Sequence, residues 1–401
     1  MYLCKSESVK YQNLIRRMGI QYRLTTTIIE DLTMEFRPEQ MAGPEQNEIR
    51  ATHLPAEWAR QSGVQLTWPH RGTDWAPILK EVTECYIRMA LEISLRERLI
   101  IVTPEPKAVE QLLQERLPRR VLGNITLCEA PTNDTWARDH GFITLLTNMG
   151  SLLLDFQFNG WGKKFPADLD NQICRRMMGQ GVLNGQYEDH LDFVLEGGSI
   201  ECDGRGTVLT TSQCLLAPNR NQPLSKDEIE EHLKRYLRVE RILWLDYGYL
   251  AGDDTDSHID TLARLCPNDT IAYVQCTEKE DEHYEELKRM EEQLQSFQTL
   301  DGRPYRLIPL PMAKAQYDEE GQRLPATYAN FLIINGAVLM PTYEDPERDE
   351  LARRQLQQAF PRHEIVPIDC RILIEQHGSL HCCTMQFPQG TSPLPPPKEG
   401  A

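Results

Sequence analysis

Near its C-terminal end the chain carries the sequence His377-Gly378-Ser379-Leu380-His381-Cys382-Cys383-Thr384-Met385-Gln386-Phe387-Pro388. This pattern predicts a short β-strand that is entered through a glycine and starts at a histidine and a cysteine. A thiol at the boundary of an element, next to a flexible turn, is a candidate nucleophile. The alternative is a buried structural cysteine, which is the more common environment of a free thiol. The rest of the chain has to decide between the two.

The composition is that of an acidic globular protein. Of its 401 residues, 40% are hydrophobic and 26% are charged, and the formal net charge is −17. This length allows two or three ordinary domains, or one large domain built from repeats. The acidity argues against binding to nucleic acid, because phosphates require surfaces rich in Lys and Arg. It favours small cationic ligands instead.

Cysteine usage and hydropathy predict a cytoplasmic location. The eleven cysteines form neither CxxC pairs nor the ligand spacing of a zinc module, so we expect reduced and mostly buried thiols. No stretch reaches the roughly 18 apolar residues that a bilayer span needs. The N-terminus also lacks the basic segment followed by an apolar segment that directs secretion. We therefore expect no membrane partner.

The two ends of the chain differ from its middle. Residues 1–49 mix charged and apolar residues irregularly and are interpreted as a partly disordered N-terminal extension. Residues 390–401 are rich in proline and are predicted to be a disordered tail, with an SH3-type ligand as the alternative. Residues 50–389 are then expected to form a single catalytic domain.

Between these ends, predicted strands and helices alternate. The predicted strands lie at 64–68, 99–102 and 125–128, and the predicted helices at 78–98, 108–117, 226–238, 280–297 and 347–360. Hairpins are predicted at 141–156, 198–211, around 258 with 270–276, at 331–341 and at 379–387. The hairpins recur about every 50–70 residues, which indicates repeated supersecondary units. The prediction is a closed α/β array of about five units.

Four stretches at the ends of these units are rich in residues that carry chemistry. They are 133–139, 195–199, 252–260 and the stretch around Cys382. Each has a simpler interpretation when it is taken alone. Asp139 could form a surface ion pair with Arg138, Trp136 could be a core residue, and Glu196 could be an ordinary turn acid. The acidic run at 253–260 could be a solvated loop, since it lacks the pattern of a calcium loop.

Taken together, the four stretches indicate one site. A thiolate attacks an electrophilic carbon, a histidine transfers protons, and two carboxylates hold a planar guanidinium through paired hydrogen bonds. If His381 and Cys382 are consecutive strand residues, they point to opposite faces, so His381 is a poor base for this thiol. His258, which lies between Asp256 and Asp260, is the better candidate. A zinc site is the rival use of such residues, but the spacing matches no zinc pattern.

These residues carry a resemblance to a known family. The chain resembles the agmatine deiminase and bacterial-type peptidylarginine deiminase family of guanidine-modifying enzymes, from Leu54-Pro55-Ala56-Glu57-Trp58 to about Pro388. Five motifs occur in the order typical of that family. They are Trp136-Ala137-Arg138-Asp139, Leu195-Glu196-Gly197-Gly198-Ser199, Gly252-Asp253-Asp254-Thr255-Asp256-Ser257-His258-Ile259-Asp260, Tyr328-Ala329-Asn330-Phe331 and His381-Cys382.

The resemblance implies both a fold and a set of roles. The fold would be the α/β pentein fold, a five-bladed α/β propeller of ββαβ-type repeats around a central active site. The implied roles are Cys382 as nucleophile, His258 as general acid and base, Asp139 and Asp260 as guanidinium carboxylates, Glu196 as a partner that sets the state of the histidine, and Trp136 and Asn330 as pocket lining. No metal or organic cofactor is implied.

The implied reaction is the hydrolysis of agmatine to N-carbamoylputrescine and ammonia, a step of putrescine and polyamine metabolism. Peptidyl-arginine or another guanidine compound is the alternative substrate, and a non-catalytic pentein that only binds a partner is the alternative from another class. One departure concerns the substrate. His377 and Ser379 stand where the family often has a glycine-rich run, which predicts a narrower or more polar pocket neck. Whether the protein forms a homo-oligomer is left open.

Overall fold

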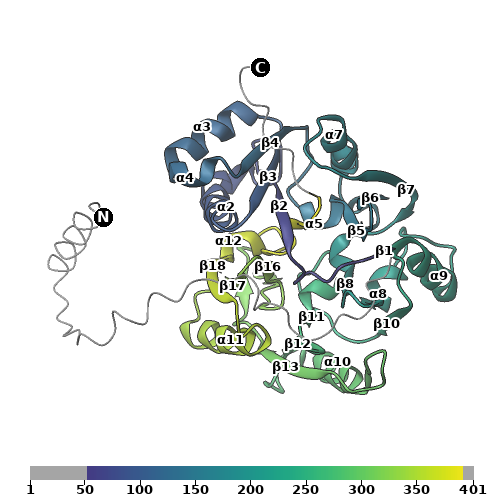
Figure 1. The fold of residues 1–401 in the computed structure, drawn as a ribbon. Coiled ribbons are helices and arrows are strands. Elements are labelled where there is room, and N and C mark those ends of the chain that lie inside the picture. The colour runs from purple at the N-terminus through teal and green to yellow at the C-terminus, as the bar shows by residue number, and fades with distance from the viewer. Residues whose placement is uncertain (1–51, 392–401) are drawn as a thin grey trace, which may run out of the picture. The chain divides into compact units, whose positions relative to one another are not determined.

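The computed structural model describes residues 52–391 of the 401-residue chain (Figure 1). The predicted extension at 1–49 lies outside the described residues, as does the predicted tail apart from positions 390 and 391. Within 52–391, no helix is both long enough and apolar enough to cross a membrane.

Five sheets of three or four strands repeat one pattern of pairing (Figure 1). In each of them, an antiparallel pair is followed by a strand that pairs in parallel with the second member of that pair. In order of pairing, the strands are β19 (Thr384–Pro388), β2 (Gln61–Thr67), β3 (Arg98–Thr103) and β4 (Ile125–Glu129); β1 (Thr52–His53), β5 (Ile143–Thr147), β6 (Gly150–Gln157) and β7 (Gln186–Val194); β8 (Ile200–Cys202), β9 (Thr207–Thr211) and β10 (Arg241–Leu245); β11 (Ala263–Cys266), β12 (Thr270–Gln275) and β13 (Arg306–Pro311); and β16 (Leu332–Ile334), β17 (Ala337–Thr342) and β18 (Glu364–Asp369). A small hairpin, β14 (Gln316–Tyr317) and β15 (Arg323–Leu324), stands apart from this pattern.

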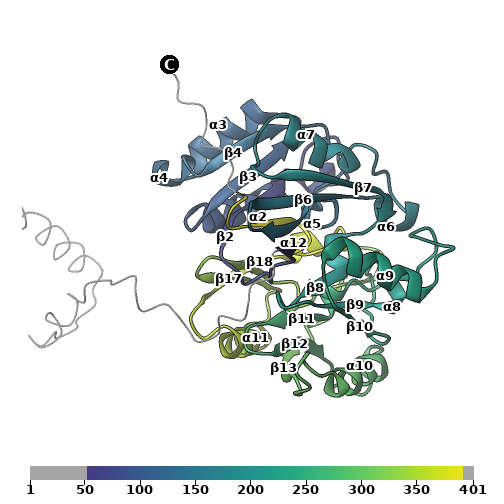
Figure 2. The same ribbon diagram turned by 45° about the vertical axis from the view of Figure 1, so that its right-hand side comes forward.

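A helix lies between the two parallel strands of every unit, as a parallel connection requires. Figures 1 and 2 show these helices on the outer sides of the sheets. The main ones are α2 (Leu79–Ser94), α3 (Pro106–Arg116), α7 (Ile173–Gly179), α9 (Lys226–Leu237), α10 (Tyr284–Ser296) and α11 (Pro346–Ala359). In helix α9 the local sequence determines where the helix starts, because Ser225 and Glu228 form a complete capping box there.

The first sheet joins the two ends of the described chain. Strand β19 pairs antiparallel with β2, with Thr384 opposite Leu66, and β2 continues in parallel to β3. The last strand of the chain therefore supplies the antiparallel partner that the first unit lacks. This pairing also fixes the turn that precedes β19, which contains Cys382.

The predicted helices are confirmed, with ends that shift by a few residues, and so are the first, second and fourth hairpins. The third hairpin exists, but its first strand is β11 at Ala263–Cys266, and position 258 caps the 3-10 helix η6 (Ile259–Thr261) instead. The prediction for 379–387 is wrong in one respect. Only Thr384–Pro388 forms a strand, and His381 and Cys382 lie in the turn before it. The edge strands β7, β10, β13 and β18 were not predicted. Two of them, β13 and β18, contain proline, which is tolerated at a sheet edge.

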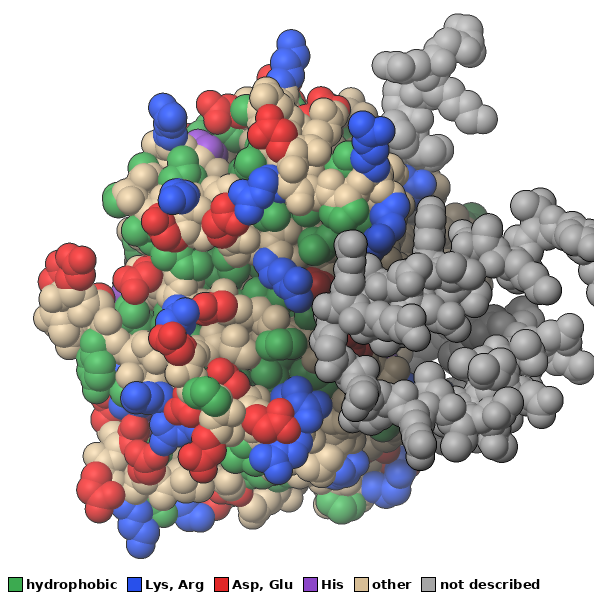
Figure 3. Space-filling view, turned by 90° about the vertical axis from the view of Figure 1, so that its left-hand side faces the viewer, with side chains coloured by type: hydrophobic (Ala, Val, Ile, Leu, Met, Phe, Trp, Pro, Cys, Tyr) green, Lys and Arg blue, Asp and Glu red, His purple; other side chains and the backbone are tan. Residues whose placement is uncertain are grey.

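The inner strand β3 is largely apolar, as expected of a strand that is covered on both faces. In β3, Leu99, Ile100, Ile101 and Val102 are all fully buried. Outside, charged side chains of both signs are interspersed on the face drawn in Figure 3. Ion pairs such as that between Arg116 of α3 and Glu84 of α2 link neighbouring helices at the surface.

Candidate active site

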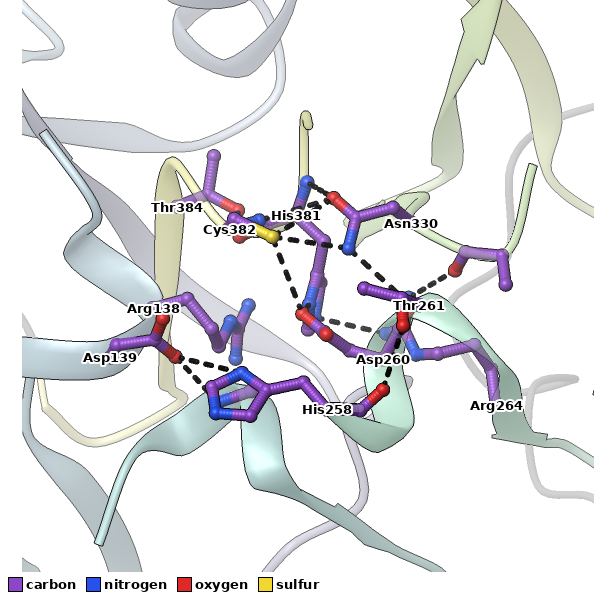
Figure 4. Close-up of polar contacts among 12 residues, drawn as sticks. Arg138, Asp139, His258, Asp260, Thr261, Arg264, Asn330, His381, Cys382 and Thr384 are labelled. Atoms are coloured by element: carbon purple, nitrogen blue, oxygen red, sulfur yellow. Dashed lines mark hydrogen bonds and ion pairs between the residues drawn. The ribbon is translucent and has the colours of Figure 1, made fainter. Parts of the chain in front are cut away.

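The predicted site residues come together from five separate segments (Figure 4). Asp139 lies in the short helix α5 (Ala137–His140), and Glu196 precedes the 3-10 helix η5 (Gly197–Ser199). His258 is the N-terminal cap of η6 (Ile259–Thr261), which also contains Asp260. Asn330 lies just before β16, and Cys382 lies just before β19. All seven predicted residues, Trp136 included, are buried.

The thiol of Cys382 faces a carboxylate and an amide (Figure 4). Its Sγ lies 3.8 Å from Asp260 Oδ2 and 3.3 Å from Asn330 Nδ2. The turn is held from two sides, since Asn330 Oδ1 accepts the His381 N–H at 2.8 Å and the Cys382 carbonyl accepts the Arg138 N–H at 3.1 Å. Burial, with the nearby charges of Asp260 and Asp139, raises the pKa of the Cys382 thiol well above its usual value.

His258 is a fully buried histidine with free ring nitrogens. Its Nδ1 lies 3.7 Å from Asp139 Oδ1, and among residues 52–391 neither nitrogen has a partner in hydrogen-bond geometry. The Cys214 thiol is close to the ring but does not meet that geometry. Burial opposes the charged ring, but Asp139 and its other acidic neighbours prevail and raise the pKa of His258 well above its usual value. An uncommitted, protonated imidazole suits a general acid.

The loop before His258 is strained. Asp256 and Ser257 have φ values of +66° and +64°, in the left-handed region that side chains disfavour. Asp253 stabilises this conformation, because its Oδ2 accepts the Ser257 N–H at 2.7 Å and its Oδ1 accepts the Thr255 hydroxyl at 2.6 Å. The acidic run is therefore a folded support and not a solvated loop. Asp256 itself points away from the histidine and pairs with Arg220 at 2.7 Å.

The two carboxylates on either side of the thiol are held in different ways. Asp139 Oδ1 accepts the Gly198 N–H at 3.0 Å, and its Oδ2 accepts the Trp161 Nε1–H at 2.9 Å. Asp260 Oδ2 faces His381 Nδ1 at 2.7 Å, whereas its buried Oδ1 has no partner among the described residues. Burial raises the pKa of Asp139 to about 6. Burial also opposes ionisation of Asp260, but the hydrogen bond from His381 and the nearby positive charges lower its pKa.

Gly198 explains how these groups can lie so close together. A Cβ atom at this position would be 2.6 Å from His258 Nδ1, 2.8 Å from Asp139 Oδ1 and 3.2 Å from Asp260 Oδ2. Only a residue without a side chain leaves room at this point of convergence.

Glu196 is fully buried, and only one of its two carboxylate oxygens has a partner among the described residues. Its Oε1 accepts from Arg220 Nε at 2.8 Å, while its Oε2 has no partner among the described residues. Sequence reasoning missed Arg220, as well as Trp161 and Cys214. Trp161 did carry a signal, since it lies between two glycines in Gly160-Trp161-Gly162, where the backbone can bend sharply. Nothing in the sequence around Arg220 or Cys214 indicates their place in the site.

A narrow pocket leads to the thiol. Its lining is Asp74, Asp134, Trp136, Asp139, Trp161, Phe165, Asp254, Thr255, Gln376, His377, Gly378 and Cys382. Trp136 packs so tightly against Gly378 that a Cβ on that glycine would be 2.2 Å from the indole ring. The predicted place of His377 at the neck is confirmed, but that of Ser379 is wrong. The Ser379 hydroxyl is buried and lies 3.0 Å from the hydroxyl of Tyr343, outside the lining.

Two groups near the pocket have the composition of a metal site. In one, single ligand atoms of Glu196, Cys214 and His258 lie within 4.8 Å of one another, and Glu57, Glu201 and His381 form the other. An arginine already pairs with a carboxylate in each group. Such a guanidinium competes with a divalent cation for the same oxygens.

Residues 53–388 match the family model described as Porphyromonas-type peptidyl-arginine deiminase. The chain belongs to this family. Within it, the chain is 33% identical over 361 residues to a protein named "Putative agmatine deiminase" from Marinomonas sp., covering 84% of this chain and 95% of that protein.

Solved structures agree with the family assignment. One is named "Putative Arginine Deiminase" from Porphyromonas gingivalis, with 52% identity and a TM-score of 0.80 over 85% of this chain and 99% of that one. The agmatine deiminase of C. jejuni, in a form with substrate bound, has 37% identity and a TM-score of 0.78 over 85% and 97% of the two chains. The mixed α/β fold is thus shared with agmatine deiminases, and members of the family hydrolyse C–N bonds of guanidino groups.

Proposed function

We propose that this protein is a cysteine-dependent deiminase that hydrolyses agmatine to N-carbamoylputrescine and ammonia. The observation that carries the proposal is the convergence of Cys382, His258, Asp139 and Asp260 at the inner end of one pocket, which Asp139 and Cys382 line. Among the described residues, His258 and Asp260 there have buried polar atoms without a partner. Buried polar groups are normally hydrogen-bonded, so atoms left free in this way are expected to meet a ligand. The names of the family members with solved structures support the same reaction.

The proposal includes the architecture. We take the five sheets to be the blades of a closed pentein propeller, formed by residues 50–389 as a single domain, with the site on its central axis. The repeated strand pairing supports this interpretation, and so does β19, which completes the sheet of β2.

In the proposed complex, Asp139 and Asp260 hold the guanidinium between them. The free Oδ1 of Asp260 and the two oxygens of Asp139 offer acceptors from both sides. Ionised carboxylates bind a guanidinium through charge-assisted hydrogen bonds. Trp136 and Asn330 would border the same space, the first in the pocket lining and the second beside the thiol.

The bound cation would also activate the thiol. Two negative charges help to raise the pKa of Cys382, and a guanidinium between them offsets both. The thiol releases its proton to solvent as the cation binds, and the thiolate attacks the guanidinium carbon, forming a C–S bond. His258 protonates one nitrogen of the adduct, the C–N bond breaks, and ammonia leaves. The neutral His258 next takes a proton from water, which attacks the thiouronium carbon. Cleavage of the C–S bond releases the ureido product and Cys382. The charge of Glu196 would support the protonated state of His258.

The pocket mouth supports agmatine over substrates that carry a carboxylate. Asp74, Asp134 and Asp254 contribute three acidic side chains, and the lining contains no Lys or Arg. The second cation of agmatine, its ammonium group, would be attracted there, whereas the carboxylate of free arginine would be repelled. An arginine within a peptide carries neither charge at that position and remains the second candidate, as the family name indicates.

A substrate comparison tests the proposal. Purified protein is incubated with agmatine, free arginine and an arginine-containing peptide, and both the ureido product and ammonia are quantified. We expect the highest kcat/KM for agmatine. A higher value for the peptide would assign the enzyme to protein arginine, and no product from any of the three would favour the non-catalytic pentein.

Two further predictions stay open in this proposal. A cytoplasmic location is supported by the ten buried free cysteines among residues 52–391, because such thiols persist in reducing compartments. The formation of a homo-oligomer stays a prediction to be checked by light scattering.

A further inference from the structure

A second buried polar cluster lies directly behind Asp260. It contains Glu57, Arg138, Glu201, Arg264 and His381, none of which was predicted to act in the site. Arg264 is its centre and is fully buried. Its guanidinium pairs with Glu201, lies 2.6 Å from Glu57 Oε2, and donates to the carbonyls of Ala329 and Phe331 at 2.9 Å and 2.6 Å.

His381 connects this cluster to the site (Figure 4). The imidazole is fully buried, with Nδ1 at 2.7 Å from Asp260 Oδ2 and Nε2 at 2.9 Å from Glu57 Oε1. Arg264 Nη2 lies 2.9 Å from the same Nε2. Both ring nitrogens are thus engaged, which distinguishes His381 from His258.

The chemistry of these contacts fixes one proton. An ionised carboxylate oxygen can only accept a hydrogen bond, so Nδ1 of His381 must be the donor to Asp260. This holds for the neutral ring and for the charged ring alike. Burial and the charges of Arg138 and Arg264 lower the pKa of His381, which favours the neutral ring with its proton on Nδ1. Nε2 then accepts from Arg264. Glu57 can only accept, so it makes no hydrogen bond to the unprotonated Nε2 and holds the ring through Arg264, which it binds at 2.6 Å.

We propose that His381 is a positioning residue, which binds Oδ2 of Asp260 through Nδ1–H and thereby leaves Oδ1 free for the guanidinium. Glu57 and Arg264 hold the ring on its other side, so the geometry of the carboxylate depends on a cluster that never touches the substrate. This role rests on the proposed function, in which Asp260 binds the guanidinium. It also corrects the sequence-based view of His381 as a residue turned away from the chemistry.

The electrostatic surroundings of the pair come from several elements. The charged or titratable groups that face Asp260 and His381 are Asp139 and Arg138 of α5, His258 before η6, Arg264 of β11, Glu201 of β8, Glu57 of the segment before β2, and Cys382. Of these, His258 and Arg264 favour an ionised Asp260, as does the His381 hydrogen bond. Without that bond the pKa of Asp260 should rise.

Two substitutions separate positioning from simple packing. His381→Asn can keep a donor near the place of Nδ1, whereas His381→Leu removes it. Loss of a hydrogen bond to a charged group corresponds to about a 10- to 100-fold fall in kcat/KM. We expect that fall for His381→Leu. Its acid limb, which Asp139 alone sets in the wild type, should steepen and move to higher pH, because Asp260 then titrates beside Asp139. His381→Asn should stay within about tenfold of the wild type, with its acid limb unchanged.

A matched control is His363→Asn, because that histidine packs against Phe360 away from the pocket and should leave both kcat/KM and the pH profile unchanged. Thermal melts report whether each variant folds. An unshifted acid limb in a folded His381→Leu protein would overturn the proposal. If His381→Leu does not fold, the His381→Asn protein decides, because a shifted limb there would contradict the assigned donor.

A spectroscopic readout does not depend on turnover. In ¹⁵N-histidine-labelled protein, the ring signals of His381, assigned by their absence from His381→Asn, should show a proton on Nδ1. A proton on Nε2 alone would overturn the proposal, even if the enzyme acts on agmatine. Conversely, wild-type protein that turns over no guanidine would disprove the proposed function, while the Nδ1 signal would still report on the hydrogen bond to Asp260.

Discussion

The two buried polar clusters that meet at Asp260 differ in how fully their groups are paired. On the pocket side, both nitrogens of His258, one oxygen of Asp260 and one of Glu196 have no partner among the described residues. On the far side, both carboxylate oxygens of Glu57 and of Glu201 and both ring nitrogens of His381 have hydrogen-bond partners. An unpaired buried group lowers stability, and a paired one fixes geometry. The pocket cluster is therefore arranged for a ligand, and the far cluster for rigidity.

The largest expected effect concerns the thiol. Cys382→Ala should reduce kcat by at least about 10⁴-fold, because no other group can form the covalent intermediate. Cys383→Ala is the matched control, since that side chain is fully buried in the apolar core. It should keep kcat within about threefold and lower the free energy of unfolding by about 1 kcal/mol. Steady-state kinetics on both proteins checks this. A large loss of kcat in Cys383→Ala with a small loss in Cys382→Ala would identify Cys383 as the nucleophile.

The next prediction contrasts stability between the clusters. Arg264→Met leaves Glu201 fully buried without its counter-charge and Glu57 with Arg138 alone, which should lower the free energy of unfolding by about 3–5 kcal/mol. His258→Ala removes a ring that makes no hydrogen bond to the described residues and has only the 3.7 Å ion pair with Asp139, so the free energy of unfolding should fall by only about 1 kcal/mol while turnover is lost. Denaturant titration measures both. If both substitutions lowered the free energy of unfolding equally, the far cluster would not be more important for stability than the pocket cluster.

Gly198 tests how closely the pocket cluster is packed. The new methyl group of Gly198→Ala would be 2.6 Å from His258 Nδ1, so the ring or the helix η5 must move. A displacement of about 1 Å in a catalytic group lowers the rate about 100-fold. We expect that loss in kcat together with a lower melting temperature, because overpacking a buried site costs about 1–3 kcal/mol. Gly123→Ala, where a Cβ meets no neighbour within 4 Å, is the control.

The pH dependence should report the pocket carboxylate. Burial raises the pKa of Asp139 to about 6, and its protonated form cannot pair with a cation. Below pH about 6, kcat/KM should therefore fall about tenfold per pH unit, while the lowered pKa of Asp260 keeps that group ionised. A pH profile of kcat/KM with agmatine, measured over about two pH units on either side of this pKa, checks the prediction. If kcat/KM stayed constant down to pH about 4, an ionised Asp139 would not be needed to bind the guanidinium.

The smallest effect is expected at the pocket mouth. Asp254 is partly exposed, with 42% of its side chain accessible, so the loss of its charge is screened by solvent. Asp254→Asn should raise KM for agmatine about two- to fivefold and leave kcat unchanged. The difference should shrink at high salt. An unchanged KM would place the ammonium group of the substrate elsewhere.

The sequence by itself determined the repeated α/β units and the residue types of the site. Hydrophobic periodicity is local, so it fixed most helices and hairpins, and Cys382, His258, Asp139 and Asp260 stood out in motifs that carry their own chemistry. The strand-face argument about His381 failed in its premise, since the turn before β19 replaces the expected strand.

Only the tertiary structure decided what surrounds those residues. His381 meets Glu57 across 324 positions, Arg264 meets Glu57 across 207, and Trp161 reaches Asp139 from another loop. Such contacts depend on how sheets are placed beside one another, and no local pattern encodes them. Glu57 illustrates the limit, because in the sequence it is one acid near a tryptophan, and in the fold it helps to hold the histidine that binds Asp260.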